Sequence, residues 1–205
     1  MNLPVLSKGI ILGFSIAAPV GPIGILCIRR TLNEGMLIGF TSGLGAATAD
    51  AIYGSIAAFG LTVVSNFLIH QQLYIHTLGS LFLLCIGWKT LRSIPSTASN
   101  SNAGQSVMSA YASTFLLTIT NPMTILSFTA VFAGLSTGTI QEKYVSTFLI
   151  VAGVFTGSML WWLLLSSVVN TLRYKFNFIW LQWVNRLAGL IIIGFAFYNF
   201  SQLFF

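Results

Sequence analysis

Charged residues are scarce in this sequence. Only 6% of its 205 residues are charged, with three acidic side chains against nine lysines and arginines. An ordinary soluble domain carries about a quarter charged residues, so this chain could not cover the surface of a soluble protein. Hydrophobic residues make up 56%, and several apolar runs are long enough for a helix to cross a bilayer. The composition therefore predicts an all-α, polytopic (multi-pass) membrane protein.

Cysteine, histidine and acidic residues are also few, which argues against several classes of function. His70 and His76 flank one loop with few other ligands nearby, so we expect neither a metal site nor a cofactor. The spans offer no nucleophile beside a base and no pair of carboxylates, so we expect no enzyme. Cys27 and Cys85 form no CxxC motif. A membrane thiol-redox carrier that uses both cysteines stays open as the alternative function, and a reversible disulfide between them would support it.

The basic residues follow the loops. The net charge is +6, but cations spread over short loops form no nucleic-acid-binding stripe. The loops on one side of the membrane hold only Lys8 and Lys143. The loops on the other side hold Arg29, Arg30, Lys89, Arg92, Arg173 and Lys175, with Arg186 just inside the last span. The positive-inside rule predicts that this richer side faces the cytosol and that both termini face outward.

Six spans fit the apolar runs, within a single transmembrane domain that covers residues 1–205. We expect them at about Gly9–Ile28, Met36–Val63, Leu73–Trp88, Ala110–Leu135, Tyr144–Val169 and Ile179–Phe204. A polar stretch at about 94–106 is typical of a flexible loop. It separates a first repeat, about 1–93, from a second, about 107–205.

The two halves share motifs in the same order. A shift of 100 residues places VGPIGIL (20–26) on TNPMTIL (120–126), and a different loop length places GFTSG (39–43) on GVFTG (153–157). Three crossings are an odd number, so the halves must have opposite orientations. The pattern predicts six transmembrane helices as a 3+3 inverted repeat with broken first and fourth helices, and a site between the halves.

The breaks fall near the centres of the first and fourth predicted spans. A proline frees the carbonyl four residues earlier, and the half-helix beyond it presents free N–H groups that suit a carboxylate. A simple kink is the alternative for one proline, whereas matched breaks favour a role in substrate binding or translocation. The candidate residues are Pro19, Gly21 and Pro22 in the first half and Asn121 and Pro122 in the second.

Asp50 is the one acidic residue inside a predicted span. The translocon-scale penalty for an acid at this depth is about 3 kcal/mol, which makes a functional role the default hypothesis. The alternative is a protonated structural acid, hydrogen-bonded to Thr48 or Tyr53. Burial disfavours the charged form, so the group can alternate between protonated and ionised as water or a cation reaches it. We therefore add Asp50 to the candidate substrate-binding residues.

Small residues recur at four-residue spacing in the second and fifth predicted spans. Gly39 and Gly43 lie on one helix face, as do Gly153 and Gly157. This small-xxx-small spacing lets helices approach closely. We expect these glycines to pack helices together.

Three segments resemble the lysine-exporter (LysE) superfamily, in particular its homoserine/threonine-efflux (RhtB) branch. They are APVGP, RRTLNEGMLIGFTSGLGAATAD and TNPMTILSF, and the resemblance covers essentially the whole chain. It implies an exporter in the inner (cytoplasmic) membrane that moves amino acids or related small metabolites outward by proton antiport. The implied partners are the small-molecule substrate, protons and the lipid bilayer; a homodimer is compatible with the family.

The resemblance also assigns residues by motif. Pro19, Gly21 and Pro22 match the first-half Pro-x-Gly-Pro, and Asn121 with Pro122 matches the second-half Asn-Pro. Gly39, Gly43 and Asp50 match the glycines and the acid of the second helix. The family's Asn-Pro-Lys is Asn-Pro-Met here, with Met123 in place of the basic residue. Substrate or coupling can therefore differ from the family pattern.

Overall fold

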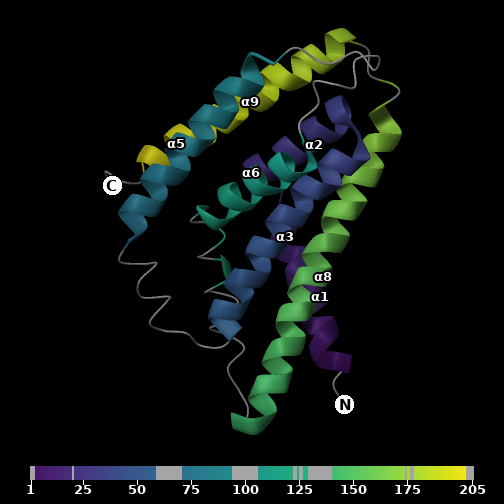
Figure 1. Ribbon diagram of the computed structural model, residues 1–205, viewed down its shortest axis with the longest axis vertical. Coiled ribbons are helices and arrows are strands. Elements are labelled where there is room, and N and C mark those ends of the chain that lie inside the picture. The colour runs from purple at the N-terminus through teal and green to yellow at the C-terminus, as the bar shows by residue number, and fades with distance from the viewer. Residues whose placement is uncertain are drawn as a thin grey trace.

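The described part of the chain is entirely helical. The computed structural model describes residues 3–19, 21–58, 71–93, 106–121, 124, 127–128, 140–173, 175 and 178–201. Within these residues it has seven helices and no strand, which confirms the all-α prediction. The helices are α1 (Leu3–Ala17), α2 (Pro22–Glu34), α3 (Met36–Ala58), α5 (Gln72–Leu91), α6 (Val107–Ile119), α8 (Ile140–Arg173) and α9 (Phe178–Ser201) (Figure 1).

The first predicted span is a broken helix. α1 and α2 meet at an angle of 82° across the break that contains Pro19 and Gly21. By length and composition, the described residues contain two helices that could cross a membrane, α8 and α9, or three spans if the bent pair counts as one. Parts of the second and fourth predicted spans lie outside the described residues. The six-span inverted repeat therefore stays a prediction.

Local chemistry explains where the helices around the breaks begin and end. Pro22 occupies the first turn of α2, where a missing N–H costs nothing. Gly35 ends the same helix at φ 99°, a left-handed conformation that favours glycine, and its N–H donates to the Thr31 carbonyl. α6 ends at Ile119, shortly before Asn121-Pro122, because the residue before a proline avoids the helical region.

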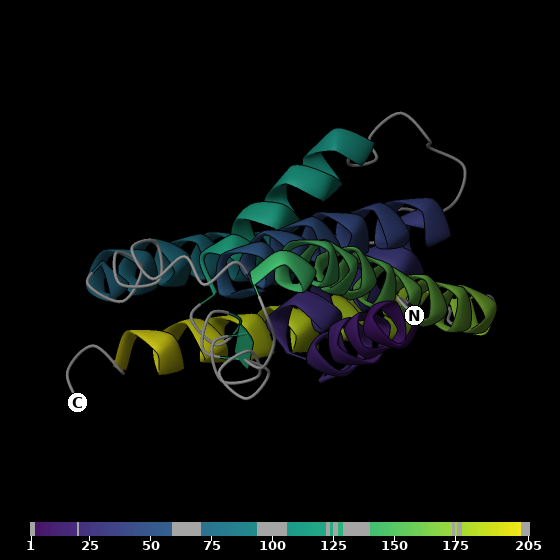
Figure 2. The same cartoon turned by 90° about the horizontal axis from the view of Figure 1, so that it is seen from below.

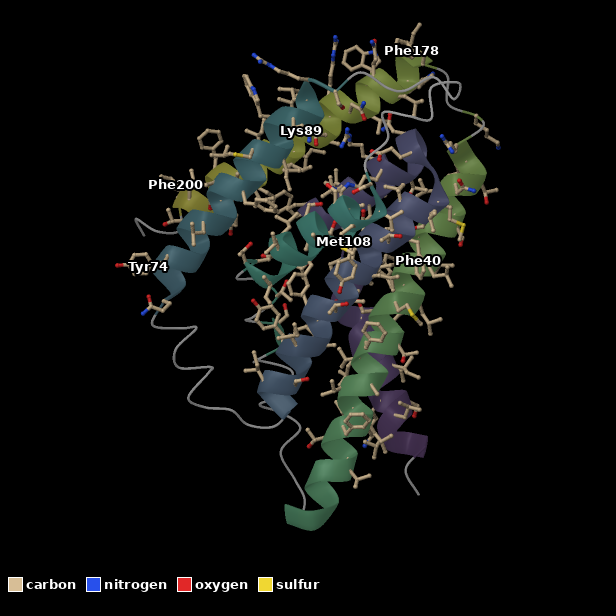
Figure 3. The ribbon with its side chains drawn as sticks, in the orientation of Figure 1. Phe40, Tyr74, Lys89, Met108, Phe178 and Phe200 are labelled. Carbon is tan, nitrogen blue, oxygen red and sulfur yellow. The ribbon has the colours of Figure 1, made fainter. Side chains whose placement is uncertain are left out.

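The helices pack in pairs. α1 lies along α8, α3 contacts both α6 and α8, and α5 contacts α9. Figure 2 shows α6 on one side of α3 and α1 on the other. α5 and α9 run antiparallel, with Lys89 and Phe178 at one end of the pair and Tyr74 and Phe200 at the other (Figure 3). In the predicted repeat, α1 corresponds to α6, α3 to α8 and α5 to α9. Exchanging the two halves therefore turns the contact between α1 and α8 into the contact between α6 and α3, and it leaves the α5–α9 and α3–α8 contacts unchanged. The predicted repeat requires this pattern.

Apolar side chains cover the outside of the helices as well as the inside. The interior holds clusters such as Cys27, Ala46, Ala47 and Trp162 between α2, α3 and α8. Large apolar side chains such as Leu37, Phe148 and Ile179 are exposed on the outer faces. Exposed apolar area of this extent is costly in water and suits a lipid environment. The distribution fits the membrane protein that the composition predicts.

Two glycines let α8 approach α1 closely. A Cβ on Gly153 would lie 2.8 Å from the Cα of Gly9, and a Cβ on Gly157 would lie 2.8 Å from the amide nitrogen of Phe14 and overlap the Ile10 carbonyl. Real Cβ atoms essentially never come this close to another backbone. The α1–α8 contact therefore depends on the missing side chains.

The glycines of α3 contact different partners. Gly39 faces the side chain of Thr31 in α2, and Gly43 faces Trp162 in α8. The contact that matches Gly157 is made by Gly45, whose Cβ would overlap the Tyr111 carbonyl and lie 3.0 Å from the Phe115 nitrogen of α6. In each half of the chain, one glycine therefore contacts a backbone carbonyl of the neighbouring helix and the amide nitrogen four residues later in that same helix.

We expect Gly157→Val to destabilise the protein, because the added side chain would force α1 and α8 apart. Overpacking of this kind costs about 1–3 kcal/mol of unfolding free energy. The measurement is the midpoint of thermal unfolding in detergent, together with the abundance in membranes. Gly194→Val is the matched control, since no described atom lies within 4 Å of a Cβ at Gly194. Equal melting midpoints for both variants would show that the α1–α8 contact tolerates separation.

Candidate functional site

A cavity of about 420 Å³ lies at the break between α1 and α2. This volume is within the range of about 300–1,000 Å³ that is typical of small-molecule sites. All seven described helices contribute to its lining. Of the candidate residues from the sequence, those that line it are Pro19, Gly21, Pro22, Asp50 and Asn121. Pro122 and Met123 lie outside the described residues.

Asp50 lies on α3 at the cavity and is 5% exposed. The Ser158 hydroxyl of α8 donates a hydrogen bond of 2.7 Å to its Oδ2 atom. The Trp162 indole in turn donates to the Ser158 hydroxyl at 3.1 Å, and Trp162 also lines the cavity. A chain of two hydrogen bonds from α8 thus fixes the orientation of the acid.

For a structural Asp50, the sequence predicts a hydrogen bond to Thr48 or Tyr53, but both of these side chains have other partners. Thr48 donates to the Leu44 carbonyl of its own helix and accepts from the Tyr111 hydroxyl. The Tyr53 hydroxyl donates to the Ile119 carbonyl at the end of α6. Among the described residues the hydrogen bond to Asp50 comes from Ser158, which is 108 positions away. Sequence reasoning limited to neighbours along one helix missed it.

The last two carbonyls of α6, before the second-half break, find hydrogen-bond donors within the protein. The Thr118 carbonyl, which Pro122 was expected to free, accepts the Asn121 N–H at 3.1 Å. The last carbonyl of α6, that of Ile119, accepts the Tyr53 hydroxyl. At bilayer depth each such group needs a partner, since lipid offers none. Tyr53 therefore caps α6 from α3, across the two halves of the chain.

The beginning of α2 faces the cavity with backbone N–H groups that have no hydrogen-bond partner among the described residues. The Ile25 N–H makes the first bond of the helix, to the Gly21 carbonyl at 3.0 Å. The N–H groups of Ile23 and Gly24 precede that bond, and no side chain caps the helix. Both residues line the cavity. The positive end of the helix dipole thus points toward the same space as Asp50.

Hydroxyl residues around Asn121 also line the cavity. They are Thr118, Thr120, Thr124 and Ser127. The hydroxyls of Thr118 and Thr120 donate to carbonyls of α6, at 2.8 and 2.7 Å, and keep their lone pairs to accept from a ligand. None of these four hydroxyl residues was predicted from the sequence. Their recurrence every two to four residues around Asn-Pro is the signal that could have found them.

Arg30 corrects the interpretation of the basic residues as loop cations. It lies within α2, is 3% exposed, and spans the gap to α3 and α6. Its Nη1 donates to the hydroxyls of Ser42 and Thr114 at 2.8 and 2.7 Å and to the Ala110 carbonyl at 3.1 Å, and its Nη2 donates to Ser113 at 2.7 Å. Within the described part of the chain these partners are hydroxyls and a carbonyl, and none is a carboxylate.

The rest of this end of α2 is tied to the remaining helices. Arg29 donates to Ser93, just beyond α5, and to Asn185 of α9, at 2.9 and 3.1 Å. Asn33 donates to the same Asn185 oxygen at 2.8 Å, and Arg173 of α8 donates to the Leu32 carbonyl at 2.9 Å. We call Arg29, Arg30, Asn33 and Arg173 the basic corner. It joins α2, α3, α6, α8 and α9, together with Ser93 just beyond α5, at the end predicted to face the cytosol.

The two cysteines are free and differ in environment. Cys27 is fully buried in α2, whereas Cys85 is exposed on α5. A thiol-redox carrier needs an accessible pair, so the structure gives the alternative function no support. No group of three His, Cys, Asp or Glu that could hold a metal ion occurs among the described residues.

Apolar outer faces, a helix broken at the cavity and a buried acid beside that break are typical of membrane transporters. The chain belongs to the LysE type translocator family, whose family model matches residues 14–202. This confirms the resemblance to the lysine-exporter superfamily.

Two relatives cover most of the chain. "Putative amino acid efflux protein YcgF" of Bacillus subtilis (strain 168) is 28% identical over 194 residues, 92% of this chain and 91% of that protein. "Uncharacterized membrane protein YahN" of Escherichia coli (strain K12) is 27% identical over 174 residues, 82% of this chain and 77% of that protein. No solved structure matches the chain.

We expect the two thiols to react differently in the folded protein. A maleimide in detergent should label Cys85 and spare Cys27 until the protein is denatured, because a buried thiol is out of reach of the reagent. Mass spectrometry of labelled peptides measures both sites, and Cys85→Ala is the control that should remove the native-state label. Labelling of Cys27 in the folded protein, or a Cys27–Cys85 disulfide, would revive the redox alternative.

Proposed function

We propose that this protein exports amino acids or related small metabolites across the inner (cytoplasmic) membrane in exchange for protons. The observation that carries the proposal is the position of Asp50, the one acid among the described cavity residues, beside the broken first helix. Membership of a translocator family supports transport, and the name of the Bacillus relative supports amino acids as cargo.

The cavity offers partners for both ends of a zwitterion. The substrate carboxylate would accept from the N–H groups of Ile23 and Gly24 at the start of α2 and from the Asn121 amide. The substrate ammonium would meet ionised Asp50, which Ser158 holds in place. A proton arriving from outside would compete with the ammonium for Asp50. One carboxylate would thereby exchange substrate for proton without a second ion site.

Alternating access would use the inverted repeat. Two features support it: the helix pairing is unchanged when the halves are exchanged, and Gly157 and Gly45 make matching contacts in the two halves. Loading from the cytosol would require the basic corner to separate, because it ties α2 to the surrounding helices. The exposed outer side chains would face lipid or, in a homodimer, a second copy of the chain.

The orientation of the chain can be measured with reporter fusions. We expect a fusion after Ser99 to report the cytosol and a fusion after Phe205 to report the outside, because the cations of the basic corner favour the cytosolic side. Paired phosphatase and fluorescent-protein reporters distinguish the two sides. A cytosolic C-terminus would contradict the six-span topology in which both termini face outward.

The proton-exchange role of Asp50 predicts the behaviour of Asp50→Asn. The amide keeps the shape and can still accept from Ser158, but it cannot titrate. We expect efflux driven by a pH gradient to fall to the level of protein-free vesicles, while exchange of labelled for unlabelled substrate without a gradient persists at saturating substrate, with weaker binding because the ammonium has lost its charged partner. The measurement is efflux of preloaded amino acids from vesicles that contain the purified protein.

Ser55→Ala is the matched control for this experiment. Ser55 is on the same helix, donates to the Ala51 carbonyl at 2.8 Å, and is not among the described cavity residues. It should export like the unchanged protein. If Asp50→Asn also exports at that rate and with the same pH dependence, Asp50 is a structural acid and the exchange mechanism is wrong.

A further inference from the structure

The cavity has two chemically different walls. Asp50, Asn121 and the start of α2 form the polar wall described above. The α5–α9 pair, which packs chiefly on itself and on α2 and α6 (Figure 1), forms the other wall. It contributes Gly79, Leu83, Phe195 and Tyr198. Among these, only Tyr198 carries a side-chain polar group, its hydroxyl.

The apolar wall continues onto the neighbouring helices. Leu83 belongs to a buried cluster with Leu117 of α6, and Ile23 of α2 packs against that cluster. All three side chains line the cavity. A ligand whose charged ends are held at Asp50 and the start of α2 would have this apolar surface, as well as the hydroxyls around Asn121, available for its remaining part.

The described cavity residues offer no second charge for a charged side chain of a ligand. None of the lysines and arginines whose side chains the structure describes is among the cavity residues. The sequence from Ser93 to Glu142, which includes the undescribed part of the second-half break, contains no Lys, Arg or His. A ligand with an extra carboxylate would bury it without a counter-charge, which is costly.

A ligand with an extra ammonium would meet the opposite difficulty. The two acids other than Asp50 lie near helix ends: Glu34 is the last residue of α2, and Glu142 is in the first turn of α8. Neither is among the described cavity residues. Asp50 would already be engaged by the α-ammonium group, so a basic side chain would lack a partner.

We propose that the exported substrate is a neutral amino acid with a bulky apolar side chain, of the size and character of leucine or phenylalanine. Its side chain would lie against Leu83, Leu117 and Phe195. This rests on the proposed function and narrows its substrate class. It differs from the hydroxyl-bearing substrates implied by the homoserine/threonine branch.

The first test is a panel of substrates with the full-length protein in vesicles. Vesicles are preloaded separately with labelled leucine, phenylalanine, valine, threonine, lysine or glutamate, and efflux is measured under the same pH gradient. We expect leucine and phenylalanine to leave at least about tenfold faster than lysine and glutamate at low concentration. Valine should be favoured over its isostere threonine by about 10- to 100-fold, the discrimination an apolar pocket gives.

The outcomes separate the two proposals. If threonine, lysine or glutamate is exported as well as leucine, the substrate class is wrong and the export function stands. If no amino acid is exported above protein-free vesicles, the proposed function itself is wrong and the substrate class falls with it.

The second test asks whether the apolar wall selects the side chain. Phe195→Ala should raise the half-saturating concentration of leucine by about tenfold or more while leaving that of alanine nearly unchanged. Phe197→Ala is the matched control on the same helix, 61% exposed and outside the described cavity lining. An equal effect of Phe195→Ala on leucine and alanine would show that the wall does not select the side chain.

Leu83→Ala repeats the test from α5, with the exposed Leu81→Ala as its control. This pair decides the matter if Phe195→Ala fails to fold. If folded Leu83→Ala loses export of all substrates to the same extent while Leu81→Ala exports them normally, the proposal is wrong.

Discussion

The structure depends on one constraint: at bilayer depth every polar group must find its partner inside the protein. The end of α6 interrupts backbone hydrogen bonding, and Asp50 places a carboxylate in the interior; each finds its partner on another helix. Tyr53 of α3 closes the last carbonyl of α6, and Ser158 of α8 holds Asp50. The side chains that make these hydrogen bonds also bring the two halves of the chain together around one cavity.

The same constraint governs the basic corner. Arg30 carries a charge into the protein interior and is held by hydroxyls and a carbonyl. Two of those hydroxyls, Ser42 and Thr114, also donate to carbonyls of their own helices, so they stay satisfied if Arg30 moves away. The Nε of Arg30 and the Oδ1 of Asn33 are buried without a partner among the described residues. Water that enters when the corner separates would satisfy them, which lowers the cost of opening.

Much of this site was predictable from short patterns in the sequence. A proline break is recognised from a few adjacent residues, and an acid in an apolar run is conspicuous, so Pro19, Pro22 and Asp50 could be selected as candidates without tertiary information. Their neighbours were not. Ser158 is one serine among many in an apolar helix, and only the packing of α8 on α3 identifies it as the partner of Asp50. A wrong partner on the same helix was the natural expectation.

Two further features depend on packing alone. Hydropathy cannot separate a cation at a helix end in water from one buried among hydroxyls of two other helices, so Arg30 was assigned to a loop. The repeat alignment paired Gly43 with Gly157, whereas the contact geometry pairs Gly45 with Gly157. Two residues correspond to about 200° around a helix, so Gly43 and Gly45 face different neighbours, and a sequence match of five residues does not reveal which of them faces α6.

The scarcity of charge around Asp50 gives the cavity its proposed chemistry. A cation fixed beside the carboxylate would favour its ionised form permanently, and a second acid would share its proton. Either would uncouple the charge of Asp50 from the arrival of substrate. The stretch from Ser93 to Glu142 contains no Lys, Arg or His, and Met123 stands where the resemblance has a basic residue. In the proposed exchange, a lone carboxylate among hydroxyls and apolar side chains would leave the substrate ammonium as the cation that decides when the proton leaves.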